Sequence, residues 1–424
     1  MLDIKFIREN VDAVKKAIVQ KGLTLDIAEL IAVDEKRRTV MQKSESLRSE
    51  QKKTEDREKA TALKAEFKEL EAELELIEKE YMRLMAQVPN IPSEDTPVGK
   101  DGHDNVEVFS SGDLPKFDFE PKDHIALAKR LNVIDFERGA KVAGYRGYYL
   151  KNEGAQLALA LMMFALNKMI AKGYQPMIPP TLVKGAALFG SGYFKGLEYD
   201  PAVDEIYEIA SQDRNMSGEQ SKEKKFLVGT AEPSLLAYYG NEIVKEDDLP
   251  IRIAGFSQCY RSEIGSYGKD TKGLYRVHEF MKVEQVVITT ADVADSDKLQ
   301  QEMTQITREI HADLGLPFRQ IQICTGDMGL GKYKMFDTEV WLPGSRRWAE
   351  TGSASNFLDW QARRLNIRYT TKSGEKKFAY LLNNTALPTP RPLIAILENY
   401  QTKDGTIKIP EVLIPYMGGK KEIV

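Results

Sequence analysis

Cysteine and histidine are scarce in this sequence of 424 residues, which has two cysteines and four histidines. Two cysteines, Cys259 and Cys324, cannot build a disulfide framework, so we expect a protein of the reducing cytoplasm. The histidines are scattered along the chain, and with so few sulfur and imidazole ligands no structural zinc site is expected. Both observations argue against small folds that depend on disulfides or zinc.

Long apolar runs and an excess of charge of one sign are also missing. No run of about 18 apolar residues occurs, and the first ten residues mix charged with apolar side chains, so we expect neither a membrane span nor a signal peptide. Lys and Arg number 60 against 64 Asp and Glu, which gives a net charge of −4. Non-specific nucleic-acid binders are usually basic, so any contact with RNA must come from a local patch.

Glycine and proline are absent between residues 28 and 87, a segment rich in the helix-favouring residues Glu, Lys, Ala and Leu. From Leu63 to Val88 the apolar residues alternate at gaps of four and three, which is typical of a coiled-coil seam. The segment KKTEDREKAT (52–61) lacks large apolar side chains, so we expect it to be a turn between two antiparallel helices. The sequence therefore predicts an N-terminal region, residues 1–99, built around a helical hairpin at about 28–87.

Charged side chains on the predicted hairpin have two explanations. The simpler one is that they form solvated faces and ion pairs between the helices. The functional one is that the first helix presents cations to the phosphate backbone of an RNA. The candidates for such contacts include Lys43, Arg48, Lys52 and Lys53.

Residues 100–424 alternate helical and strand patterns, and a chain of this length is expected to form two or three domains. Residues 155–172 predict an apolar helix, and 251–263 and 278–290 predict two strands around a loop containing Gly265, Gly268 and Gly273. Further strands are expected at 335–343, 346–357 and 376–384. Few βαβ repeats are present, which favours an antiparallel α+β domain. The segment GDMGLGK (326–332) lacks the spacing of a phosphate-binding P-loop.

Three stretches concentrate residues suited to a nucleotide. CYRSEIGSYGKDTKGLYRVHEFMKVEQ (259–285) supplies arginines, whose planar fork binds phosphate through two hydrogen bonds, and Phe280, which could stack on a purine. WAETGSASNF (348–357) places Glu350 and Ser353 on one predicted strand. NNTALPTPRPLIAILENYQ (383–401) places Arg391 at the start of a helix, where unpaired N–H groups favour an anion.

Taken together, the segments at about 155–180, 251–288 and 383–401 resemble the three signature motifs of class II aminoacyl-tRNA synthetases. With the hairpin, VPNIP (88–92), GTAEPSL (229–235) and LIAILENYQ (393–401), the resemblance extends over essentially the whole chain and is closest to the seryl-tRNA synthetase family. It implies a homodimer with a class II catalytic domain at 100–424. It also implies that ATP and Mg²⁺ activate L-serine as seryl-adenylate, from which the seryl group passes to tRNA(Ser) and, where present, tRNA(Sec).

The resemblance also implies individual roles. Arg261 and Arg391 match catalytic arginines, and Phe280 and Arg391 match the groups on either face of adenine, with Arg276 on the γ-phosphate. Glu350 and Ser353 match the residues that hold Mg²⁺. The full nucleotide set is Arg261, Ser262, Glu263, Arg276, Val277, Phe280, Glu350, Thr351, Gly352, Ser353 and Arg391. The serine set is Thr230, Ala231, Glu232, Arg261, Glu284 and Thr385, and Lys43, Arg48, Lys52 and Lys53 would contact tRNA.

Some features depart from the family. The stretch that is usually Glu-Ile-Ser-Ser is Glu350-Thr351-Gly352-Ser353 here, so Gly352 removes a hydroxyl. The third motif, usually rich in glycine, contains Pro388 and Pro390, which restrict the backbone. The hairpin also looks about two heptads shorter than common bacterial versions.

Alternative explanations remain open. A related ligase could load an amino acid onto a carrier protein, although such enzymes lack the hairpin. A non-catalytic paralogue is the other alternative, and it would be expected to lose Arg261, Glu350 or Arg391. Thr385 could simply cap a turn and Glu232 could be an acid at a helix start, whereas Cys259 is expected to be a small buried residue.

Overall fold

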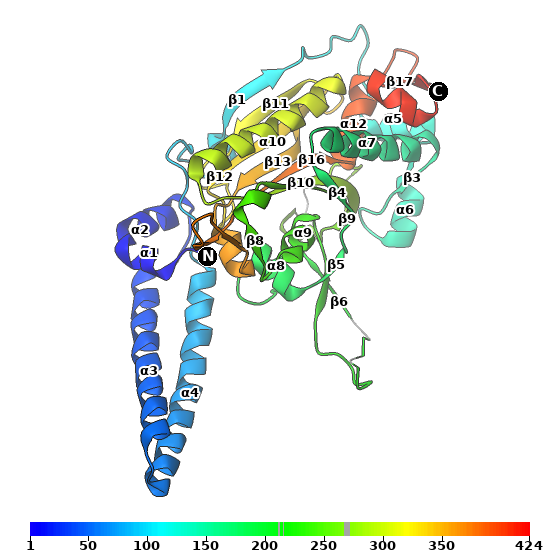
Figure 1. The fold of residues 1–424 in the computed structure, drawn as a ribbon. Coiled ribbons are helices and arrows are strands. Elements are labelled where there is room, and N and C mark those ends of the chain that lie inside the picture. Colours follow the sequence, from blue (N-terminus) through cyan, green and yellow to red (C-terminus); the bar gives the residue numbers. More distant parts are fainter. Residues whose placement is uncertain (211–212, 215, 267–271) are drawn as a thin grey trace.

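The computed structural model describes residues 1–210, 213–214, 216–266 and 272–424. It consists of a long helical hairpin that projects from a body built on a large sheet (Figure 1). Gly268, in the predicted glycine-containing loop, lies outside the described residues.

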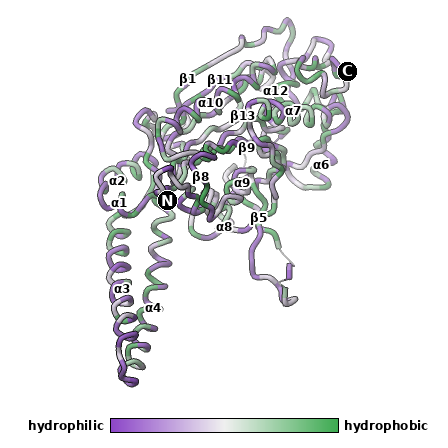
Figure 2. The backbone as a smooth tube through the Cα atoms, viewed as in Figure 1, coloured by the Kyte–Doolittle hydropathy of each residue, from purple (hydrophilic) through white to green (hydrophobic). Residues whose placement is uncertain are grey.

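The hairpin is formed by α3 (Ile27–Lys53) and α4 (Arg57–Ala86), which confirms the predicted pair of helices. The turn between them is only residues 54–56, so the prediction of a turn at 52–61 was wrong in extent. Asp56 accepts hydrogen bonds from the backbone N–H groups of Glu58 and Lys59 at 2.9 and 3.3 Å, and this cap allows α4 to begin at once. Figure 2 shows that α3 is largely hydrophilic along its length.

A charged residue of α3, Arg37, lies at the interface with α4. The Arg37 guanidinium lies 4.7 Å from the centre of the Tyr81 ring and 3.5 Å from a carboxylate oxygen of Glu78 on α4. Arg37 therefore contributes a cation–π contact and an ion pair to the interface between the helices.

The base of the hairpin is joined to the body through one apolar core. Ile7 of α1 (Ile4–Glu9) and Val14 of α2 (Val11–Gln20) pack with Leu30 and Leu84 of the hairpin, and Trp360 of the body belongs to the same cluster. The Trp360 indole N–H also donates to the carbonyl of Val88 at 3.2 Å. This shared core anchors the hairpin to the body.

The body contains an eight-stranded sheet in the order β1-β11-β12-β13-β16-β10-β9-β4, antiparallel throughout except where β4 pairs with β9. This arrangement confirms the predicted antiparallel α+β fold. The predicted strand at 376–384 is divided between two strands, β15 and β16. The strands of the large sheet are β1 (Val106–Ser111), β4 (Gln175–Met177), β9 (Ile251–Tyr260), β10 (Glu279–Thr289), β11 (Phe318–Gln322), β12 (Lys334–Leu342), β13 (Arg347–Asn356) and β16 (Tyr380–Pro388).

Helices α7 (Asn152–Ala171), α10 (Val293–Asp313) and α12 (Pro390–Asn399) contribute to the main hydrophobic core with the sheet. Gly173, with φ of +83°, follows the end of α7. By length and composition alone α7 could cross a membrane, but core helices pass the same test, and half of its apolar stretch is buried in the body. The remaining α-helices of the body are α5 (His124–Leu131), α6 (Phe136–Ala143), α8 (Gly185–Ser191), α9 (Glu232–Tyr238) and α11 (Trp360–Leu365).

Short elements complete the described chain. The small strands are β2 (Ile134–Asp135), β3 (Tyr149–Leu150), β5 (Leu182–Lys184), β6 (Tyr207–Ile209), β7 (Lys225–Leu227), β8 (Ile243–Lys245), β14 (Arg368–Thr370), β15 (Lys376–Phe378), β17 (Ile407–Lys408) and β18 (Glu422–Ile423). Four 3₁₀ turns are described, namely η1 (Gly102–Asp104), η2 (Glu246–Asp248), η3 (Ile264–Ser266) and η4 (Glu411–Met417).

Candidate functional site

Two cavities share part of their lining on β10, β13 and β16. The first contains about 570 Å³ of empty space and the second about 1190 Å³. Arg261, Lys282, Glu350 and Thr385 line both. Of the predicted nucleotide residues, the first cavity includes Arg261, Glu263, Arg276, Val277, Phe280, Glu350, Thr351, Gly352 and Arg391. Of the predicted serine residues, the second includes Glu232, Arg261, Glu284 and Thr385, together with Ser353.

Three residues of the predicted nucleotide and serine sets line neither cavity. Thr230 and Ala231 are buried in the segment that leads into α9, and Ser262 directly follows Arg261 on the chain. The hydroxyls of Thr230 and Ser262 are buried without a hydrogen-bond partner among the described residues. The predicted tRNA contacts Lys43, Arg48, Lys52 and Lys53 are exposed and line neither cavity. They lie on α3, in the hairpin that projects from the body (Figure 1).

The β9–β10 hairpin positions the first arginine. Arg261 follows the last residue of β9, and its backbone N–H donates to the carbonyl of His278 at 3.0 Å. Its Nε donates to the carbonyl of Gly229 at 3.4 Å, and its guanidinium lies 5.6 Å from the centre of the Phe280 ring. Cys259, opposite Phe280 in this strand pair, is fully buried as expected, and burial raises the pKa of its thiol.

The start of α12 positions the second arginine. Arg391 Nη1 donates to the backbone carbonyl of Glu350 at 2.7 Å and to its carboxylate at 3.3 Å. Its Nε donates to the carbonyl of Tyr275 at 3.3 Å, and its guanidinium lies 4.7 Å from the centre of the Tyr275 ring. Arg391 thus joins the third motif to β13 and to the end of the second-motif loop.

Two predicted nucleotide residues bind each other. Arg276 Nη1 lies 3.1 Å from a carboxylate oxygen of Glu263, and the same carboxylate is 3.8 Å from Arg146. The resemblance assigned both side chains to the nucleotide and did not predict the ion pair. In this structure their charges are already compensated within the first cavity.

A buried polar set on β10 and β16 faces both cavities. Thr385 Oγ1 donates to Glu284 at 3.3 Å and accepts from Lys282 Nζ at 3.3 Å, and Lys282 is also ion-paired with Glu284. Lys282 was missed in the sequence analysis. The strand period could have identified it, because Phe280, Lys282 and Glu284 are spaced by two residues and so face the same side of β10.

Glu232 opens α9 and is fully enclosed. One carboxylate oxygen accepts from Gln361 Nε2 at 2.7 Å and the other from the Tyr193 hydroxyl at 3.0 Å. Burial, followed by the nearby Glu284 charge, raises the pKa of Glu232. The carboxylate is therefore held by side chains and faces the second cavity rather than acting only at the helix start.

Asp337 and Glu350 bring two carboxylates to the second cavity beside Ser353. Asp337 faces Ser353 in the β12–β13 pairing, and burial and then the Glu350 charge raise the pKa of Asp337 well above its usual range. A divalent cation would relieve this crowding. In the described part of the chain no three or more His, Cys, Asp or Glu side chains cluster as a metal site, but Mg²⁺ is commonly held by one or two carboxylates plus phosphates. These residues therefore fit Mg²⁺ accompanied by a nucleotide.

The unusual Thr351 and Gly352 fit closely against their surroundings. A Cβ on Gly352 would lie 3.1 Å from the carbonyl oxygen of Thr385, which is tighter than ordinary packing. The Thr351 hydroxyl lies 2.8 Å from His311 Nε2, and His311 Nδ1 lies 2.7 Å from the carbonyl of Thr307. Burial lowers the pKa of His311 to about 4, so a neutral His311 donates to Thr307 and accepts from Thr351. The Thr351 hydroxyl is therefore engaged with His311.

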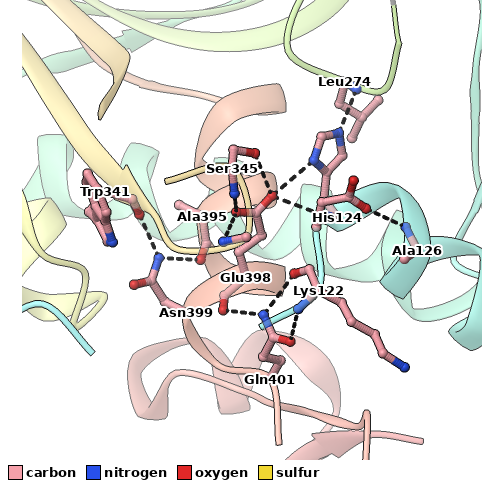
Figure 3. Close-up of polar contacts among 12 residues, drawn as sticks. Lys122, His124, Ala126, Leu274, Trp341, Ser345, Ala395, Glu398, Asn399 and Gln401 are labelled. Carbon is pink, nitrogen blue, oxygen red and sulfur yellow. Dashed lines mark hydrogen bonds and ion pairs between the residues drawn. The ribbon is translucent and has the colours of Figure 1, made fainter. Parts of the chain in front are cut away.

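A buried network links α12 to the base of the second-motif loop (Figure 3). Glu398 Oε1 lies 3.2 Å from His124 Nδ1, and His124 Nε2 accepts from the backbone N–H of Leu274 at 3.2 Å. Because Nε2 accepts, Nδ1 carries the proton and donates to Glu398. The other Glu398 oxygen accepts from the N–H groups of Gly344 and Ser345 at 2.9 and 3.2 Å. Leu274 directly precedes Tyr275 and Arg276, so this network positions the rim of the first cavity.

Comparisons with known proteins agree with these features. Residues 215–400 match the tRNA synthetase class II core domain (G, H, P, S and T), and residues 1–57 match the seryl-tRNA synthetase N-terminal domain. The chain is 41% identical to a serine–tRNA ligase of Treponema denticola, with 99% of each chain covered. It also resembles the seryl-tRNA synthetase from Pyrococcus horikoshii complexed with ATP, with 36% identity, a TM-score of 0.88 and coverage of 100% of this chain and 99% of that one. A cytoplasmic serine–tRNA ligase from Naegleria fowleri in complex with AMP gives 31% identity, a TM-score of 0.85 and coverage of 100% and 98%.

Proposed function

This chain belongs to the seryl-tRNA synthetase family of the class II aminoacyl-tRNA synthetases, and from that premise we propose that ATP binds in the first cavity and serine in the second. The enzyme attaches serine to tRNA at the expense of ATP. The observation that carries the assignment is that both cavities share Arg261 in their lining. A residue in that position can contact the α-phosphate and the serine carboxylate together.

In the first step the serine carboxylate attacks the α-phosphorus of ATP, giving seryl-adenylate and pyrophosphate. In the second, a ribose hydroxyl at the end of the tRNA takes the seryl group and releases AMP. Arg261 and Arg391 would stabilise charge on the phosphate and hold the nucleotide, and no protein nucleophile is required. Asp337, Glu350 and Ser353 would hold Mg²⁺, which neutralises phosphate charge when bound.

Selection of serine would depend on the polar set of Lys282, Glu284 and Thr385. These side chains already bond to one another, and a serine hydroxyl could join them. Alanine would bring no such group and would leave the buried set with an unmatched partner, which disfavours its activation. Glu232 would receive the α-ammonium, with Thr230 and Ala231 shaping the wall behind it.

The hairpin would bind tRNA(Ser) outside the active site. Lys36 on α3 is paired with Glu73 at 3.2 Å. Lys43, Arg48, Lys52 and Lys53, farther toward the tip, have no ion-pair partner within the described residues and are exposed. We place the boundary between the tRNA-binding region and the catalytic domain at residues 99–100. Charging of tRNA(Sec), where that tRNA exists, and a cytoplasmic location belong to the same proposal.

A homodimer is also proposed, formed through α7 and the segment after β4. Leu159, Met163 and Ile170 are exposed on α7, and Ile178 is exposed two residues before Pro180. Such a concentration of exposed apolar side chains is typical of an interface. A single monomeric species by light scattering at micromolar concentration would contradict it.

The proposed activity is tested by pyrophosphate exchange with each amino acid, followed by charging of tRNA(Ser) with and without its long variable arm and of tRNA(Sec). Serine alone should support rapid exchange, and exchange should require Mg²⁺. A non-catalytic paralogue would give no exchange. A ligase for a carrier protein would exchange pyrophosphate but would not charge tRNA.

Pro388 and Pro390 should set the turn before Arg391 in advance of ATP binding. Both line the first cavity, and between them Thr389 donates its N–H to the carbonyl of Met281 at 2.9 Å while its hydroxyl accepts from the Met281 N–H at 3.1 Å. Replacing Pro388 by Ala and Pro390 by Gly increases the conformational freedom of the backbone in the unfolded and ligand-free states. The loss of this freedom on ordering costs about 0.4–1 kcal/mol at each position. The double variant is therefore expected to bind ATP about five- to thirtyfold more weakly and to discriminate less between serine and alanine.

The measurements for this variant are ATP affinity and the ratio of serine to alanine activation. Pro392→Ala is the control, since Pro392 lies in the same helical turn but lines neither cavity. If both quantities match those of the parent enzyme, the prolines have no role in preorganisation.

His124→Phe is expected to raise the KM for ATP about tenfold while leaving the KM for serine within about twofold. The substitution leaves the buried N–H of Leu274 without its acceptor, at a cost of about 1–3 kcal/mol, and frees the segment that carries Tyr275 and Arg276. Steady-state pyrophosphate exchange measures both constants.

Asn399→Ala serves as the control for that variant. Asn399 lies on α12, as Glu398 does, and its side-chain amide donates to the carbonyls of Trp341 on β12 and Ala395 on α12, away from the second-motif loop (Figure 3). It should lower the melting temperature without changing the KM for ATP. A His124→Phe enzyme with a lower melting temperature and an unchanged KM for ATP would mean that the network stabilises the fold only.

A further inference from the structure

Lys332 lies on the loop between β11 and β12 and lines the second cavity. Within the described residues its ammonium makes one hydrogen bond, to the Met335 sulfur at 3.1 Å, and sulfur is a weak acceptor. The carboxylates of Asp337, Glu232 and Glu350 act on it electrostatically, but none of the described carboxylates forms an ion pair with it. Burial nevertheless lowers the pKa of Lys332. A cation therefore faces the proposed amino-acid site with most of its hydrogen-bonding capacity unused.

The loop that carries Lys332 is held firmly from the other side by the N-terminal region. The buried ammonium of Lys21 donates to the carbonyls of Gly329, Leu330 and Lys332 at 3.2, 3.0 and 2.7 Å, which uses all three of its donors. Asn90 adds a backbone N–H to the Leu330 carbonyl at 2.9 Å and a side-chain N–H to that of Gly331 at 3.1 Å. The backbone of the loop is therefore fixed, and the position of the Lys332 side chain at the cavity is a built feature of the fold.

We propose that Lys332 binds the carboxylate of the amino-acid substrate, as the cationic counterpart of Glu232. This inference rests on the proposed location of serine in the second cavity. A free amino acid is a zwitterion, with an ammonium and a carboxylate on the same carbon. Glu232 and Lys332 line one cavity and interact electrostatically, so together they offer a complementary pair of charges. Arg261, shared with the first cavity, would hold the other side of the carboxylate where it meets ATP.

The contribution of Lys332 should appear in binding rather than in the chemical step. The serine carboxylate carries its full charge before activation, and that charge is lost when its oxygen bonds to phosphorus. A cation on the carboxylate therefore stabilises the bound substrate at least as much as the transition state, and its removal should change KM more than kcat.

Lys332→Met, which keeps the length of the side chain and removes its charge, provides the test. In pyrophosphate exchange the KM for serine should rise about 10- to 100-fold, on the scale of one charge-assisted hydrogen bond, with kcat and the KM for ATP each within about threefold. Serinamide, in which a neutral amide replaces the carboxylate, is the probe for mechanism. Its inhibition constant against serine should be nearly the same in the parent enzyme and the variant.

Lys334→Met is the matched control. Lys334 is two residues away and buried, but its ammonium is paired with Asp95 and Asp297 at 3.0 Å each and it lines neither cavity. This variant should lose stability and keep the KM for serine. If Lys332→Met is not folded, as judged by its melting curve, Lys332→Gln replaces it in the same measurements.

Two results would overturn the inference. One is an unchanged KM for serine in the folded Lys332 variant. The other is an equal weakening of the binding of serine and of serinamide, which would indicate a distorted cavity rather than the removal of a carboxylate partner. Failure of the parent enzyme to exchange pyrophosphate with serine would instead contradict the proposed function.

Discussion

Arg261→Ala should slow seryl-adenylate formation by a few hundredfold or more, equivalent to about 3–4 kcal/mol of lost transition-state stabilisation. This is the scale observed when one preorganised donor to a developing oxyanion is removed. Arg261 is the strongest candidate because it lines both cavities and is fixed by the carbonyls of His278 and Gly229. Its guanidinium therefore needs no rearrangement when charge develops at the α-phosphorus.

Arg261→Lys tests whether the shape of the cation matters as well as its charge. Lysine supplies a point charge without the planar fork that bonds two oxygens together, so it should recover little of the lost rate. The measurement is pyrophosphate exchange at saturating serine and ATP, expressed as a ratio of rates. An Arg261→Lys enzyme whose exchange rate is within about threefold of the parent rate would show that charge alone is sufficient and would contradict the bidentate role.

The parts of the fold that were predicted correctly depend on local patterns. The hairpin follows from apolar residues at gaps of three and four, and the β9–β10 pair from two strand-like segments around a glycine-containing loop. The turn at 54–56 was placed too broadly because the end of α3 and the cap at Asp56 are decided by single hydrogen bonds, which apolar spacing does not report.

In the candidate site, too, some features could be predicted from the sequence and others could not. Family motifs identified the residues that the first cavity gathers, including Arg261, Glu350 and Arg391. The ion pair between Glu263 and Arg276 and the contact of His124 with Leu274 were not predicted, because they join segments 13 and 150 residues apart. Lys21 acts on a loop more than 300 residues away. Contacts of this kind have no periodic signal in the sequence and arise only when the fold brings the segments together.

Removing the outer part of the hairpin should abolish tRNA charging while leaving serine activation within about twofold of the parent. The structure shows where to cut. Lys36 pairs with Glu73 across the hairpin, whereas Leu30 and Leu84 belong to the core that anchors it to the body. Deleting residues 41–72 and joining Val40 to Glu73 through a short glycine–serine turn therefore preserves the base and removes all four predicted tRNA-binding cations.

The expected difference between the two steps follows from the location of the residues. Every side chain proposed for adenylation lies after residue 229, in the body, while the removed cations lie on α3. Pyrophosphate exchange should thus remain normal, and kcat/KM for charging tRNA(Ser) should fall about 100-fold or more. A truncated enzyme that charges tRNA as well as the parent would show that the hairpin is structural only.

Removing charges within the intact hairpin tests the contribution of these charges to RNA binding while the shape of the hairpin is kept. With Lys43, Arg48, Lys52 and Lys53 changed to glutamine, tRNA affinity should fall and its dependence on salt should flatten, by a slope of about 0.7–0.9 for each phosphate that is no longer neutralised. Lys36→Gln is the control, because its ammonium is already paired with Glu73 and should release few counterions. Equal salt slopes for the quadruple variant and the parent would place the phosphate-binding cations elsewhere on the molecule, since a cation that meets no phosphate cannot alter counterion release.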